Sequence, residues 1–247
     1  MRLALRRRKQ AALPVGTDEM RAAWQCASLL LGYPDEQLLA HLPVLRDTSA
    51  QLPEVVGEPL GRLVATISAA ADAGELDVLQ KRYVDTFDYT RRCAPYLTYF
   101  AHGDTRKRGM ALVQFKQTYR RAGVEMGDEE LPDHLAVVLE FGATVDLEAA
   151  LTLVLDHRAG LEVLRLALLD RDVPWADVLV AVCATLPPLD GDEQTAVARL
   201  VAQGPPSEDV GLAPYEIDPR LNPHPATDPS PEELEAELLQ HTQGGRS

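Results

Sequence analysis

Apolar residues recur every three or four positions along most of the chain, which is the spacing of one face of an α-helix. No segment shows the alternation of apolar and polar residues that is typical of a β-strand. The pattern therefore predicts an all-α protein with roughly nine or ten helices and no sheet. The first apolar face is formed by Met20, Ala23, Trp24, Ala27, Leu30 and Leu31.

Two later segments lead to more specific expectations. The run of Leu, Val and Ala from residue 146 to about residue 171 is apolar on much of its circumference, which predicts one long central helix. The helix before it is expected to be capped by Asp133 and to break near Gly142.

Composition divides the chain into three parts. The first ten residues hold Arg2, Arg6, Arg7, Arg8 and Lys9, whereas residues 205–247 hold eight of the 18 prolines and nine acidic residues against two arginines. Such segments lack the apolar content that would offset the entropy of ordering. We expect a disordered basic arm over 1–16, a single compact helical domain over 17–204 and a disordered acidic tail over 205–247.

The charge of the chain limits the kinds of partner that it can bind, and its cysteines indicate the compartment. The net charge of −14 disfavours nucleic acid and anionic membrane and favours basic partners. Residues 81–121 hold ten Lys and Arg against three acidic residues, whereas residues 122–203 hold four against sixteen. No apolar run approaches ~18 residues, so no membrane insertion is expected. Three isolated cysteines, Cys26, Cys93 and Cys183, are typical of reduced thiols in a cytoplasmic protein.

No pattern for catalysis or for metal binding is found. A helical di-metal site requires two Glu-x-x-His pairs, and neither occurs among the carboxylates and histidines between Glu140 and Glu162. No glycine-rich phosphate loop and no nucleophile triad can be recognised from spacing. We therefore expect no metal, no cofactor and no enzymatic activity.

Two polar motifs are candidates for binding. The stretch Glu130-Leu131-Pro132-Asp133-His134 precedes an apolar helix, either as ordinary helix-start chemistry or as a polar spot at a groove mouth that accepts hydrogen bonds from a basic peptide. The stretch from Tyr96 to Gly109 combines aromatic residues with Arg106-Lys107-Arg108. The total charge argues against nucleic-acid binding there, and the arginines would otherwise pair with acidic helices.

These motifs occur in an order that resembles a known family. Tyr83-Val84-Asp85-Thr86-Phe87-Asp88 comes first, and Tyr96 to Tyr99, His102 to Gly109, Glu130 to Leu135 and Leu139 to Phe141 follow. Together with Leu29 to Pro34 near the start, they resemble the NarJ family of nitrate reductase molybdenum-cofactor assembly chaperones (delta subunits), within the wider TorD/DmsD-like group. The resemblance covers residues 20 to about 185.

The resemblance implies an all-helical TorD/NarJ-like fold without catalysis of its own. It implies binding of the apo catalytic (alpha) subunit of nitrate reductase, through a leader-like N-terminal segment, before molybdenum-cofactor insertion. The alternatives are a structural subunit retained in the reductase and a helical metal-dependent hydrolase. The residues expected to bind the peptide are Tyr83, Phe87, Glu130, Pro132, Asp133 and His134. The other residues of the family motifs are Tyr96, Tyr99, His102, Gly103, Asp104, Arg106, Arg108 and Gly109.

The expected disorder of the tail leads to a first prediction. Truncation after Gly204 should leave the melting midpoint nearly unchanged, because residues 205–247 contribute too little apolar surface to stabilise the fold. Thermal unfolding of the full chain and of the truncated chain, followed by circular dichroism, compares the two. A decrease of many degrees would show that the tail packs on the helical domain.

Overall fold

The structure is a computed structural model, and it describes residues 13–103, 105–127 and 130–204. The chain divides into two units, Met1–Glu208 and Asp209–Ser247, and every described residue lies in the first. Most of the predicted basic arm and the whole predicted tail lie outside the described residues, so those boundaries stay predictions.

The all-α prediction is confirmed in the described part of the chain, where the one β-type pairing is an isolated bridge between Tyr96 and His134. Eleven α-helices and one short 3-10 helix are present there, slightly more than predicted. Their bounds are α2 (Thr17–Leu30), α3 (Glu36–Gln51), α4 (Glu54–Asp72), α5 (Leu76–Phe87), η1 (Arg91–Cys93), α6 (Tyr99–His102), α7 (Arg106–Arg121), α8 (Leu135–Thr144), α9 (Leu147–Asp156), α10 (Arg158–Asp170), α11 (Ala176–Ala184) and α12 (Gly191–Gln203).

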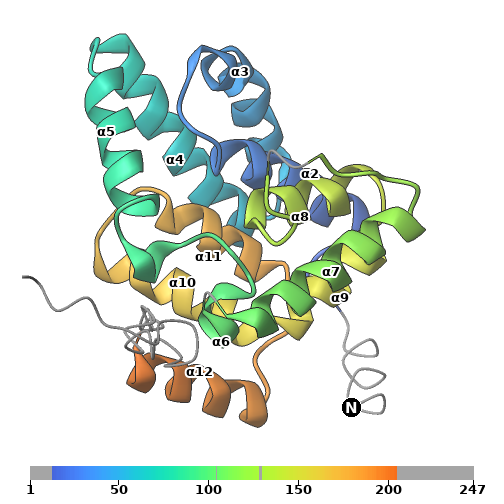
Figure 1. Cartoon of the computed structure of the whole chain (residues 1–247). Coiled ribbons are helices and arrows are strands. Elements are labelled where there is room, and N and C mark those ends of the chain that lie inside the picture. The colour runs from blue at the N-terminus through green and yellow to red at the C-terminus, as the bar shows by residue number, and fades with distance from the viewer. Residues whose placement is uncertain (1–12, 104, 128–129, 205–247) are drawn as a thin grey trace, which may run out of the picture. The chain divides into compact units, whose positions relative to one another are not determined.

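Helix α2 forms the centre of the bundle and contacts α3, α4, α8 and α11 (Figure 1). Its predicted apolar face is the buried one: Met20, Trp24 and Leu30 have no exposure to solvent. The indole N–H of Trp24 donates to the Thr185 hydroxyl at 3.0 Å, so the polar edge of this ring is also satisfied. Burial of side chains of this size contributes roughly 1.5–3 kcal/mol each, which makes α2 the main apolar anchor of the fold.

The close approach of α8 to α2 depends on Gly142. A Cβ atom at this position would lie 2.7 Å from ring carbons of Trp24 and 2.8 Å from the Cβ of Ala150. The predicted break near Gly142 is confirmed to within two residues, because α8 ends at Thr144 and the next helix follows Asp146. The glycine is required by the packing between helices and does not end the helix.

The predicted single helix over 146–171 is wrong. The chain forms α9 and α10, separated at His157, whose backbone leaves the helical region with φ −110° and ψ 20°. The His157 ring packs on the Phe115 ring of α7, with 5.3 Å between centroids. Both helices bury apolar faces, so the apolar periodicity continues through the break and does not reveal it.

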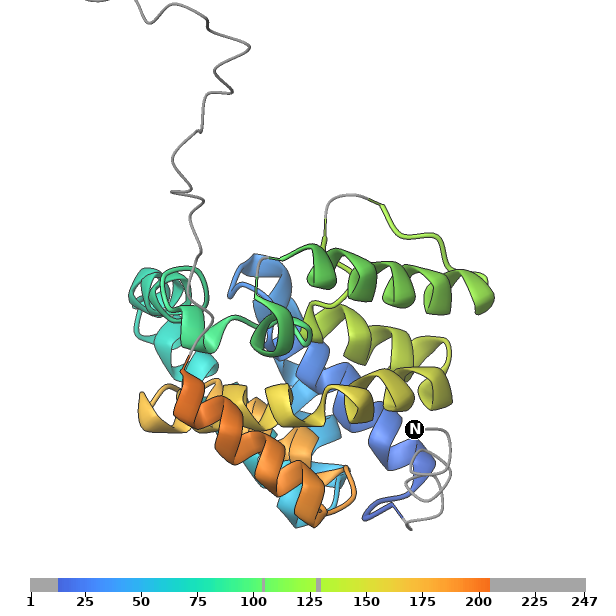
Figure 2. The same ribbon diagram turned by 60° about the horizontal axis from the view of Figure 1, so that its bottom comes forward.

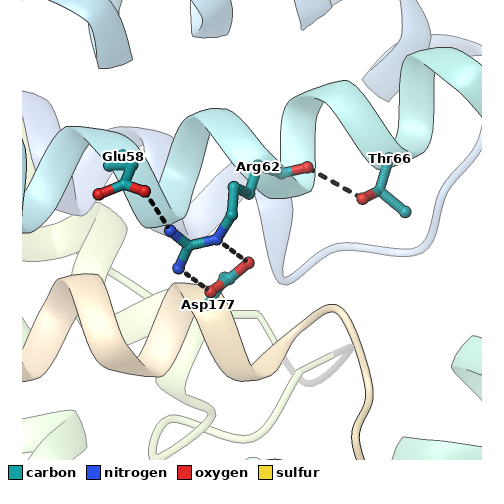
Figure 3. Close-up of polar contacts among 4 residues, drawn as sticks. All are labelled: Glu58, Arg62, Thr66 and Asp177. Carbon is teal, nitrogen blue, oxygen red and sulfur yellow. Dashed lines mark hydrogen bonds and ion pairs between the residues drawn. The ribbon is translucent and has the colours of Figure 1, made fainter.

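A polar contact joins α4 to α11 at the surface, as Figure 3 shows. The guanidinium of Arg62 binds Asp177 through Nε–Oδ2 at 3.2 Å and Nη2–Oδ1 at 2.5 Å, and it also pairs with Glu58 at 3.0 Å. The Asp177 hydrogen bond is the main cause that raises the pKa of Arg62. Because half of the Arg62 side chain is exposed, this pair contributes at most about 1 kcal/mol. The apolar contact between the two helices dominates.

Within the described ranges, no helix is both long enough and apolar enough to cross a membrane.

His157 makes stability depend on pH. Burial lowers its pKa to about 4 from 6.5, and His102 adds to this shift. The unfolded chain therefore binds the proton more readily, so stability is lost as pH falls from about 6.5 towards 4. We expect His157→Gln to reduce the loss over this range by about 2–3 kcal/mol, measured by urea unfolding at several pH values. Parallel pH profiles of wild type and variant would show that His157 titrates normally in the folded protein.

Candidate functional site

Two of the motif segments run antiparallel and share backbone hydrogen bonds. The Leu97 N–H donates to the Asp133 carbonyl at 3.0 Å, and the Leu135 N–H donates to the Pro95 carbonyl at 2.7 Å. This short pairing brings the tyrosine-rich motif before α6 beside the turn before α8. Motifs that are far apart in the sequence therefore form one structural unit.

Helix α7 closes over this pairing. The Tyr119 hydroxyl donates to the Pro132 carbonyl at 2.6 Å. The guanidinium carbon of Arg108 lies 5.2 Å from the centroid of the Tyr96 ring and 5.7 Å from that of Tyr99. Contacts of a cation with an aromatic face contribute about 0.5–2 kcal/mol each, so the two tyrosines hold the guanidinium in place.

Asp133 is the polar centre of this unit and has no exposure to solvent. Its Oδ2 accepts from the Thr98 N–H at 3.2 Å and from the Thr98 hydroxyl at 2.5 Å, and it lies 3.8 Å from Nη2 of Arg108. The N-cap of α8 is His134, so the expectation that Asp133 caps this helix is wrong. Asp133 instead joins the turn to α7 and to the tyrosine-rich segment.

A groove of about 390 Å³ lies on the surface beside this unit. Its walls come from the end of α2, the start of α3, Tyr83 of α5 and the start of α8, and these four helices are labelled in Figure 1. The lining residues are Ser28, Leu29, Leu31, Gly32, Tyr33, Asp35, Gln37, Leu38, His41, Tyr83, Glu130, His134, Ala136, Val137 and Glu140.

One wall of the groove is aromatic. The rings of Tyr33 and Tyr83 meet edge to face with 5.5 Å between centroids, and Phe87 and Trp175 support Tyr83 from behind at 4.8 and 5.3 Å. The Tyr83 hydroxyl donates to the Leu31 carbonyl at 2.8 Å, and burial raises the pKa of Tyr83. Tyr33 is 46% exposed, so it offers an apolar face that the structure already orients.

The rest of the lining is partly acidic. It contains Asp35, Glu130 and Glu140 and, among the described residues, no lysine or arginine. Asp35 also caps α3 by accepting from the Leu38 N–H at 2.9 Å. Burial lowers the pKa of His134, so its ring is neutral at pH 7. A groove lined by aromatic rings and carboxylates suits a segment that carries both apolar and cationic residues.

The structure places the six expected peptide-binding residues at different depths. Tyr83, Glu130 and His134 line the groove. Phe87 is 7% exposed behind Tyr83, and Pro132 and Asp133 are buried below the groove surface. These last three can act on a ligand only through the residues that they position.

The other family-motif residues support the unit or lie outside it. Tyr96, Tyr99 and Arg108 form the cation–aromatic contact. Gly103 ends α6 with φ +54°, a conformation that favours glycine, and His102 closes the last turn of that helix. Arg106 and Gly109 are exposed on α7, and Asp104 lies outside the described residues.

Sequence reasoning did not identify several of the groove residues, among them Tyr33, His41 and Glu140. Tyr33 lies within the stretch from Leu29 to Pro34, so a signal for it existed. Glu140 lies within the motif from Leu139 to Phe141, so a signal existed for it as well. His41 is an isolated polar residue on α3, and only the tertiary structure brings it to the groove. In the described ranges, no group of three or more His, Cys, Asp or Glu residues could hold a metal ion.

The family model described as "Nitrate reductase delta subunit" matches residues 49–181, more than half of the chain. The probable nitrate reductase molybdenum cofactor assembly chaperone NarJ of Bacillus subtilis is 30% identical over 172 residues, which are 70% of this chain and 92% of that protein. NarJ of Escherichia coli K12, with the same chaperone description, is also 30% identical, over 67% of this chain and 70% of that protein.

A third similarity is to a longer protein. The nitrate reductase-like protein NarX of Mycobacterium tuberculosis H37Rv is 39% identical over 176 residues, which are 71% of this chain. The chain spans only 26% of the length of that relative.

The buried position of Asp133 leads to a stability prediction. Asp133→Asn should lower the free energy of unfolding by about 3 kcal/mol, because it removes a fully buried charge from its contacts with Thr98 and Arg108 and weakens the bonds to Thr98. The matched control is Glu130→Gln in the same turn, which is exposed and should change stability by less than about 0.5 kcal/mol. Urea unfolding of both variants makes the comparison. Equal stability of Asp133→Asn and wild type would show that the buried contact is not structural.

Proposed function

The chain belongs to the nitrate reductase delta subunit family, and on this basis we propose that it is a molybdenum-cofactor assembly chaperone for nitrate reductase, without catalysis of its own. Two relatives carry this description, at 30% identity over 92% and 70% of their length. The observation of the structure that carries the proposal is the acidic and aromatic groove between α2, α3, α5 and α8.

The proposed partner is the apo catalytic subunit of nitrate reductase, held through its leader-like N-terminal segment. An amphipathic helix is the element that suits a groove with one aromatic wall, because its apolar residues recur on one side. Tyr33 and Tyr83 would contact that side. Lysines or arginines on the edges of the same segment would face Glu130 and Glu140.

Apolar contacts should supply most of the affinity. Carboxylates at the edge of a groove remain hydrated, so each pair contributes only about 0.2–1 kcal/mol, whereas a buried aromatic anchor contributes about 2 kcal/mol or more. The carboxylates mainly select a cationic segment and orient it.

The chaperone effect follows from differential affinity. A protein that binds the cofactor-free client more tightly than the loaded client stabilises the cofactor-free state by that difference alone. The leader segment attaches the client to the chaperone. Closure of the client around its inserted cofactor would weaken this binding. A tenfold difference in affinity between the two states corresponds to about 1.4 kcal/mol.

Titration of the peptide tests the groove. A synthetic peptide with the sequence of the catalytic subunit's N-terminal segment should bind the full chain, with a dissociation constant near micromolar (about −8 kcal/mol). Tyr33→Ala should weaken binding about thirtyfold, because an exposed aromatic anchor is removed without disturbing the core. Glu130→Gln and Glu140→Gln should each weaken it less than about tenfold and make it less sensitive to salt.

The matched control is Tyr89→Ala, which removes a tyrosine that is 79% exposed and is not part of the groove lining. Calorimetry on all four variants gives the comparison, with their melting midpoints as the folding control. Equal loss in Tyr33→Ala and Tyr89→Ala would place the binding surface elsewhere. Failure of the wild type to bind the peptide would overturn the proposed attachment.

A further inference from the structure

The chain has a second surface of opposite charge, on α7. This helix carries six lysines and arginines and no acidic residue, within a chain of net charge −14. Figure 2 shows α7 at the edge of the bundle, next to α8, so one long side of it faces outwards. Three side chains of α7 point inwards. Arg108 contacts Asp133, Phe115 packs on His157, and Tyr119 packs on Phe141 of α8.

The outward side combines cations with apolar residues. Met110 and Val113, three positions apart, are 69% and 52% exposed. Four exposed cations lie at the two ends of the helix, on either side of Met110 and Val113. Within the described part of the chain, no hydrogen bond or ion pair involves the side chains of these cations. They are Arg106, Lys107, Arg120 and Arg121. With a rise of 1.5 Å per residue, the two ends lie about 20 Å apart.

The first turn of α7 carries positive side chains at the end of the helix where the helix dipole disfavours positive charge. The N-terminal end of a helix is electropositive, so Arg106 and Lys107 reduce the stability of α7. The N-cap residue Thr105 does not compensate, because its hydroxyl donates to the His102 carbonyl and accepts no hydrogen bond from the N–H groups of the first turn. Local preferences are violated in this way mainly where a residue serves a function other than stability.

The chemistry of this side favours an acidic protein segment over other anionic partners. Helices that bind at a membrane surface insert Trp, Phe and Leu, whereas Phe115 of α7 faces inwards and only Met110 and Val113 face outwards. A nucleic acid is also disfavoured, because residues 122–203 carry sixteen acidic side chains against four basic ones and would repel its phosphates.

We propose that the outward side of α7 docks an acidic amphipathic helix of a partner protein. Carboxylates of that helix pair with the cations at the two ends of α7, and its apolar residues cover Met110 and Val113. This surface is separate from the α2–α3–α5–α8 groove, so the proposal is independent of the peptide that the groove binds.

The probe is a fluorescent helical peptide of about 18 residues that carries glutamates in its first and last turns and two leucines on one central face. Anisotropy titration into the full chain should give saturable binding that weakens strongly as salt rises. The double variant Arg106→Glu/Lys107→Glu should weaken binding about tenfold or more, whereas the control Arg199→Glu on α12 should change it less than about twofold. A scrambled peptide of the same composition should bind more weakly.

The same double variant separates binding from stability. Because glutamates suit a helix N-terminus, its melting midpoint should equal that of the wild type or exceed it by up to about 4 °C. A clear decrease would show that the two cations stabilise the fold, which would overturn the proposal. Equal binding by variant and wild type, no saturable binding of the probe, or tighter α7-dependent binding of phosphatidylserine vesicles or duplex DNA would also overturn it.

Discussion

A carboxylate that is removed from water must be stabilised by the protein around it, and Asp133 obtains this stabilisation from two distant parts of the chain. Thr98 provides two hydrogen bonds and Arg108 the opposite charge. Replacing Thr98 or Arg108 would remove one of the partners of the buried Asp133 carboxylate. The turn before α8, the tyrosine-rich segment and α7 are therefore held in one arrangement, which fixes His134 at the edge of the groove.

The fold was predictable to the extent that local apolar periodicity determines it. The face around Trp24 was predicted correctly, because one side of a buried helix repeats every 3.6 residues. The break at His157 was not predictable, because both α9 and α10 bury apolar faces and the periodicity continues between them. The packing role of Gly142 was not predictable for a related reason: a glycine that permits close packing looks the same in a sequence as one near a helix end.

The candidate site was predictable only in part. The motif that contains Pro132, Asp133 and His134 could be recognised, but the sequence could not distinguish a carboxylate that faces a ligand from one that binds Thr98 35 positions earlier. Asp before a helix usually caps it, and this local preference gave the wrong role. The groove combines four helices, so residues such as His41 carry no signal before the tertiary structure is known. Tyr83, at the centre of the aromatic wall, was identified because it lies within a motif.

The central claim is that the groove holds the N-terminal segment of a cofactor-free client, and site-specific crosslinking tests it most directly. A photoreactive residue in place of Tyr33, with the same residue at Tyr89 as the control, would be introduced in cells that are blocked in molybdenum-cofactor synthesis. The account predicts a crosslink from position 33 to the N-terminal segment of the nitrate reductase catalytic subunit, which diminishes when cofactor synthesis is restored. A crosslink of equal yield from position 89, or one from position 33 that does not respond to the cofactor, would contradict it.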